Sequence, residues 1–135
     1  MKKLLLSIEA MILLIPLSVA VCYASALTLI IGIPASIAQQ LDAGSSYDPM
    51  LPLSAIGNIA GVYALVVLWS LVLNTIQGRR YTFTHTFRLG VVAGIVASLC
   101  LIIIYDWPAL VFGVIPPVVL AIHFVIIQRM RFTNA

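Results

Sequence analysis

Charge is scarce in this sequence. Only 8% of its 135 residues are Asp, Glu, Lys or Arg, whereas soluble domains carry about a quarter. The hydrophobic share is 63%, and the mean hydropathy is +1.19. A soluble fold of this length cannot bury so much apolar surface. The composition therefore excludes an ordinary soluble domain and predicts that a lipid bilayer is the solvent.

Signatures of catalysis, metal binding and nucleic-acid binding are also missing. The sequence has no HExxH, GxSxG, Gly-rich phosphate loop or carboxylate cluster, so we expect no catalytic residue and no enzyme activity. Its two cysteines, Cys22 and Cys100, lie in apolar runs without a CxxC or His partner. We therefore expect packing residues and no metal or cofactor, while a disulfide stays open. The net charge of +3 comes without a basic stripe, so nucleic acid is not an expected partner.

Four apolar runs predict an all-α fold, a polytopic four-helix transmembrane bundle. We expect a single transmembrane domain with helices at about residues 4–31, 53–76, 87–105 and 108–128. The first run exceeds the roughly 20 residues that a bilayer needs, and Gly32-Ile33-Pro34 predicts its end.

The short turn around Asp106 predicts that the third and fourth helices are antiparallel neighbours. That turn is one of two connections without a basic residue; the other is 42–50. All seven basic residues lie in the remaining segments: Lys2, Lys3, Arg79, Arg80, Arg88, Arg129 and Arg131. Because short loops rich in Lys and Arg stay in the cytoplasm, this pattern predicts both termini inside. We expect a multi-pass protein of a bacterial-type inner (plasma) membrane.

The N-terminus allows two interpretations. Lys2-Lys3, the apolar run and Ala24-Ser25-Ala26 are typical of a secretory signal that is cleaved after Ala26. However, Glu9 interrupts the apolar run, and the run continues to Ile33. These two features favour an uncleaved first membrane helix.

Three polar residues fall at similar distances from the cytoplasmic ends of their predicted helices: Glu9, Asn74 and His123. A hydrogen-bonded Glu9–His123 pair with Asn74 beside it would satisfy all three, and would form a candidate polar layer for proton or cation coupling. The alternative is that Glu9 reaches the interface beside Lys2 and Lys3, while His123 only packs.

Small residues recur at helical spacing in the second and third runs. Gly57 and Gly61 form one such face, and Gly90, Gly94 and Ser98 form the other. Small residues let helix backbones approach closely. We expect these helix-packing faces to meet within the chain, and self-association through them is the alternative.

Two classes of function fit this reading. The first is a non-enzymatic accessory, assembly or immunity-type protein that contacts another membrane protein through its helices or outer loop. The chain has too few polar residues in its spans to build a substrate path of its own. The second class is a small oligomeric transporter or channel that uses the candidate polar layer. The predicted partners are the bilayer and either another membrane protein or a second copy.

Overall fold

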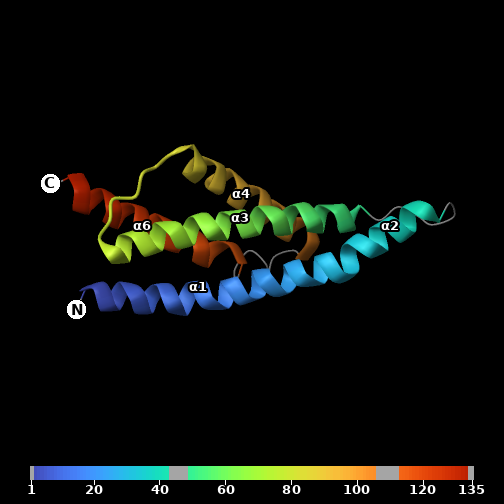
Figure 1. The fold of residues 1–135 in the computed structure, drawn as a ribbon, viewed down its shortest axis with the longest axis horizontal. Coiled ribbons are helices and arrows are strands. Elements are labelled where there is room, and N and C mark those ends of the chain that lie inside the picture. Colours follow the sequence, from blue (N-terminus) through green and yellow to red (C-terminus); the bar gives the residue numbers. More distant parts are fainter. Residues whose placement is uncertain (1, 43–48, 106–112, 134–135) are drawn as a thin grey trace.

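The computed structural model describes residues 2–42, 49–105 and 113–133, and the fold is all-α (Figure 1). The elements are α1 (Lys2–Leu27), the π-helical turn η1 (Thr28–Gly32), α2 (Ile33–Leu41), α3 (Met50–Gln77), α4 (His85–Tyr105) and α6 (Ile115–Thr133). Since α1, η1 and α2 follow one another without a break, the described ranges contain four helical stretches.

Three of these stretches are long and apolar enough to cross a membrane. They are Leu4–Leu41, Pro52–Gln77 and His85–Ile104. The fourth, Ile115–Met130, is apolar but shorter, and residues 108–112 of its predicted span lie outside the described residues. Large aliphatic side chains remain exposed along the helices, as a lipid environment favours. The protein therefore has the composition of a small multi-span membrane protein.

The sequence predicted that the first helical stretch ends at Gly32-Ile33-Pro34, but this prediction is wrong. The stretch passes through η1 and continues to Leu41. Pro34 lies at the start of α2, and the Ile33 N–H donates to the Thr28 carbonyl, five residues back. A proline ring clashes with the carbonyl four residues before it. The wider π turn relieves that clash, so the helix survives a proline that was expected to stop it.

The end of α3 is set by Gly78. This residue has a positive φ of 75°, which glycine adopts without strain. The Gly78 N–H donates to the Thr75 carbonyl and the Arg79 N–H to the Asn74 carbonyl, at 3.1 and 2.9 Å. This double hydrogen bond is a Schellman motif, which satisfies carbonyls at the end of the helix.

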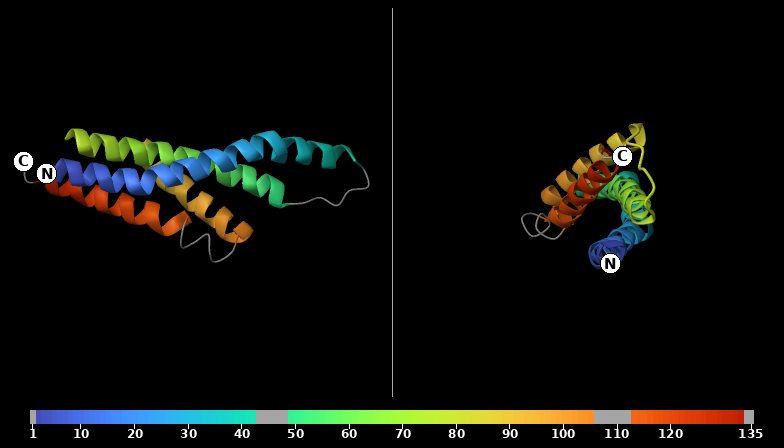
Figure 2. Two further views of the ribbon diagram at one scale, coloured as in Figure 1. Left: turned by 90° about the horizontal axis from the view of Figure 1, so that it is seen from below. Right: turned by 90° about the vertical axis from the view of Figure 1, so that its left-hand side faces the viewer.

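α3 lies at the centre of the bundle and packs against α1, α4 and α6 (Figure 2). The main core joins α1, α3 and α6 through eight buried residues: Ala10, Leu14, Leu65, Leu68, Leu71, Val72, Leu120 and Phe124. The described part of α6 packs against α3 and α1, whereas α4 packs mainly against α3. The sequence predicted that α4 and α6 are antiparallel neighbours, but the described parts of these two helices pack mainly against α3 and not closely against each other.

Candidate functional site

One end of the bundle gathers all of the basic residues. The N-terminus of α1, the C-terminus of α6 and the C-terminus of α3 lie there, and the connection 78–84 runs from this end to the start of α4 (Figure 1). The seven Lys and Arg residues belong to these helix ends or to the connection 78–84. We call this region the basic end.

Glu9 of α1 and His123 of α6 are in direct contact near the basic end. His123 Nδ1 lies 2.7 Å from Glu9 Oε1. The contact is a hydrogen bond when the imidazole is neutral with Nδ1 protonated, and an ion pair when the ring is charged. Both side chains stay partly exposed, His123 at 44% and Glu9 at 35%. The pair therefore joins two helices at the surface of the bundle, not in its core.

Asn74 does not join this pair. Its Nδ2 donates to the Ser70 carbonyl one turn earlier in α3, at 2.7 Å. The next residue, Thr75, is the one that faces the core, at 1% exposure. A rotation of about 100° per residue separates the two directions. The structure thus brings together two of the three residues of the candidate polar layer.

A buried glutamine on α6, which the sequence analysis treated only as a helix boundary, forms the main polar connection here. Gln128 is 3% exposed. Its Nε2 donates to Thr75 Oγ1 at 2.9 Å and to the Arg79 carbonyl at 3.1 Å, and its Oε1 accepts from the Tyr81 N–H at 3.3 Å. The available signal was an amide side chain four residues after Phe124, on the apolar face of α6.

Three aromatic rings lie beside this glutamine. Tyr81, Phe83 and Phe87 contact one another edge to face, with centroid distances of 5.0 to 5.9 Å. Tyr81 and Phe87 also pack against the main core. Burial raises the pKa of the Tyr81 phenol above its ordinary value of 10.0. The cluster therefore anchors the connection between α3 and α4 to the main core.

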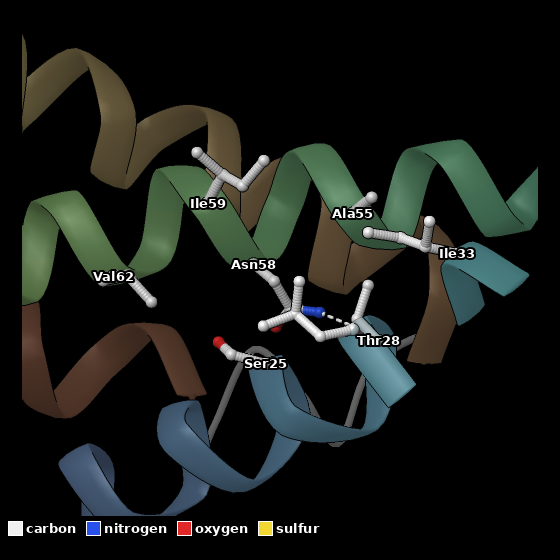
Figure 3. A pocket seen from close by; sticks show the side chains of 8 residues that line it. Ser25, Thr28, Ile33, Ala55, Asn58, Ile59 and Val62 are labelled. Atoms are coloured by element: carbon white, nitrogen blue, oxygen red, sulfur yellow. Dashed lines mark hydrogen bonds between the residues drawn. The ribbon is translucent and has the colours of Figure 1, made fainter. Parts of the chain in front are cut away.

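Two further polar contacts join α1 and η1 to α3 away from the basic end. Asn58 Nδ2 donates to Thr28 Oγ1 at 2.6 Å, and Trp69 Nε1 donates to Ser18 Oγ at 2.9 Å. Asn58 and Thr28 lie in a groove of about 230 Å³ (Figure 3). Its other lining residues are Ser25, Leu29, Ile33, Ala55, Ile59 and Val62. The groove is nearly all aliphatic, and its polar donors on Ser25, Thr28 and Asn58 already donate to acceptors of the protein.

The small residues of α3 face α4. A Cβ on Gly57 would lie 2.7 Å from Cys100 Cβ, and one on Gly61 would lie 3.7 Å from Ala97 Cβ. The first distance is shorter than any ordinary contact. Gly57 therefore marks a place where the two helices touch through the glycine backbone.

The glycines of α4 face α3 in turn. A Cβ on Gly90 would lie 2.7 Å from Val67 Cγ1, and one on Gly94 would lie 3.6 Å from Ala64 Cβ. Each glycine thus meets a side chain of the facing helix and not another glycine. Ser98 is a neighbour on this stripe, where its Oγ donates to the Gly94 carbonyl at 2.7 Å.

The polar side chains of the described residues form hydrogen bonds and do not form a metal centre. The described residues contain no group of three or more His, Cys, Asp or Glu side chains placed to bind a metal ion. Cys22 and Cys100 are free thiols, the first exposed and the second buried. No family model, curated protein or solved structure matches this chain. The functional argument therefore depends on the chain's own residues.

Proposed function

We propose that this is a non-enzymatic accessory, assembly or immunity-type protein that binds another membrane protein within the bilayer. The observation that carries this proposal is the state of its buried polar groups. In the described part of the chain, no buried side-chain nitrogen or oxygen lacks a hydrogen-bond partner. Thr75 and Gln128, the buried polar residues of that part, bond to each other. Polar groups engaged in this way support the fold and leave little to line a substrate path.

The outer surface supports the same proposal. On α1, large aliphatic side chains are exposed along the whole helix, and only a small share of its span is buried within the monomer. A helix with so much exposed surface can bind a helix of another protein while the bundle stays folded. Close packing and interhelical hydrogen bonds drive such association in lipid, where the hydrophobic effect does not act between helices.

The orientation is part of this proposal. Both termini lie in the cytoplasm, and the membrane is a bacterial-type inner membrane. Support comes from the basic end, because Lys and Arg near the ends of membrane helices are retained on the cytoplasmic side. The same residues suit a leaflet that carries anionic lipids.

Extraction from native membranes in mild detergent tests the proposal. The tagged chain should co-purify with a different polypeptide in a fixed ratio. If the protein purifies without any other polypeptide from its native membrane, even after crosslinking in place, the proposal fails.

A transporter or channel is the second candidate, and one observation favours it. The Glu9–His123 pair joins two ionisable side chains at a partly exposed position. Because the pair lies on the outside of the bundle, a path through it needs several copies. A proton-dependent flux in vesicles that Glu9→Gln abolishes would support this candidate over an accessory role.

A further inference from the structure

We infer that the face around the Glu9–His123 pair binds a second copy of this chain. The two copies would be related by a two-fold axis along the membrane normal. This inference goes beyond the proposed function, because it assigns a specific surface and a specific occupant. The inferred dimer also does not require a different polypeptide as a partner.

The first step is the hydrogen-bonding capacity that the pair leaves unused. One contact joins His123 Nδ1 to Glu9 Oε1. Among the described residues, the second carboxylate oxygen and the second ring nitrogen have no partner. The carboxylate oxygen is an acceptor, and the ring nitrogen becomes a donor when the imidazole is charged. With the imidazole charged, the pair therefore presents one acceptor and one donor side by side.

The second step is the surface around the pair. Positions three and four residues away on a helix share its face. The exposed residues among these neighbours are Leu5 and Ile12 for Glu9 on α1, each 65% exposed, and Val119 and Ile126 for His123 on α6, at 56% and 49%. A polar pair is thus flanked by uncovered aliphatic side chains on both helices. An ionisable group in a membrane span normally faces a bundle interior or water, not such a surface.

The third step is symmetry. A two-fold axis brings Glu9 of one copy to His123 of the other, and the reverse contact follows from the same operation. Acceptor then meets donor twice, in one closed ring of four side chains. Because the axis runs along the membrane normal, the pairs lie at equal depth in both copies. The self-complementarity of the pair is the reason for choosing a second copy as the occupant.

Cysteine crosslinking in native membranes tests this face. The background carries Cys22→Ala and Cys100→Ala, and single cysteines are introduced by Ile12→Cys or Ile126→Cys. The matched control is Leu89→Cys on α4, also an exposed aliphatic residue in the half of the bundle near the basic end. Oxidation should give a disulfide-linked dimer at position 12 or 126 and none at 89. A dimer only at position 89, or none at any position, overturns the inference.

A bulky substitution separates the dimer from the fold. Ile126 is exposed and lies outside the main core, so we expect Ile126→Trp to obstruct the face and to leave the core in place. It should lower the dimer fraction in vesicles, measured by energy transfer between labelled copies, by about tenfold relative to Leu89→Trp. An equal dimer fraction in the two variants overturns the inference.

The two proposals fail separately. If the cysteine at position 126 captures a different polypeptide and no second copy, the dimer is wrong and the proposed function is supported. If it captures a second copy while nothing else co-purifies, the dimer is supported and the proposed function is wrong.

Discussion

Gln128 of α6 donates a hydrogen bond from Nε2 to Thr75 Oγ1 of α3 at 2.9 Å, and Thr75 in turn donates to the Leu71 carbonyl at 2.7 Å. Both side chains are almost fully buried. The same glutamine reaches backbone groups of Arg79 and Tyr81 beyond the end of the helix. One side chain thus ties α6 both to the last turn of α3 and to the connection that follows it.

Replacing this glutamine should destabilise the protein measurably. Gln128→Leu removes the buried hydrogen bond to Thr75 Oγ1 and takes the side-chain partner from the part-buried Arg79 carbonyl and Tyr81 N–H. A typical hydrogen bond in a protein contributes about 1 kcal/mol to stability. Thermal unfolding in detergent measures the loss. Gln77→Leu is the control, because Gln77 is exposed at the end of α3. Equal melting temperatures for the two variants would show that the buried network contributes nothing to stability.

The four stripe glycines should respond unequally to alanine. Gly57→Ala and Gly90→Ala place a Cβ 2.7 Å from a facing atom, so α3 and α4 must separate. Overpacking of this kind costs about 1–3 kcal/mol. Gly61→Ala and Gly94→Ala create ordinary contacts of 3.7 and 3.6 Å. These two should be neutral or slightly stabilising, because alanine is the better helix former.

Thermal unfolding of the four single variants in the same detergent measures whether their stabilities differ in this way. The pairs are matched controls for each other, since all four positions lie on one interface between α3 and α4. Loss of self-association without any loss of stability would place the stripe between copies instead.

Removing the polar contact at the groove should have a small effect. Asn58→Leu abolishes the hydrogen bond to Thr28, and such bonds between membrane helices are worth about 0.6 kcal/mol on average. Added apolar contact offsets part of that loss, so the melting temperature should change little. A cost as large as that of Gln128→Leu would indicate that the π turn depends on this bond.

Alkaline pH should weaken the connection between α3 and α4 through Tyr81. Since burial raises the pKa of its phenol, the unfolded state loses the proton first as pH rises. The contribution of Tyr81 is therefore complete below pH 10.0 and declines as pH rises through the folded pKa. Tyr81→Phe should flatten this part of the stability profile, while Tyr23→Phe should not. An unchanged profile in Tyr81→Phe would remove the phenol as the cause.

Reporter fusions test the orientation. A reporter that is active only in the periplasm should work after Asp48 or Asp106 and stay silent after Arg80 or Arg131. The reason is the confinement of all seven basic residues to the basic end. Activity after Arg80, or silence after Asp48, would contradict the proposed topology.

The sequence by itself determined the class of this protein. Low charge and long apolar runs predicted an all-α chain with helices long enough to cross a membrane, because no soluble core could absorb that surface. The spacing of Gly57 and Gly61 also indicated where helices come close, since spacing on one helix is a local property. Such features need no knowledge of the rest of the chain.

Only the tertiary structure decided which side chains meet. Asn74 and Thr75 are adjacent in sequence, yet Thr75 faces Gln128 while Asn74 bonds back to its own helix. The direction of a side chain depends on how each helix is rotated about its axis, and packing against the other helices sets that rotation. The continuation of the helix through Pro34 is similar, because the π turn at Thr28 lies where Asn58 of α3 supplies a hydrogen bond. The sequence determines the residue types and their positions along each helix. The rotation of each helix about its axis, and the partner of each side chain, depend on the assembled bundle.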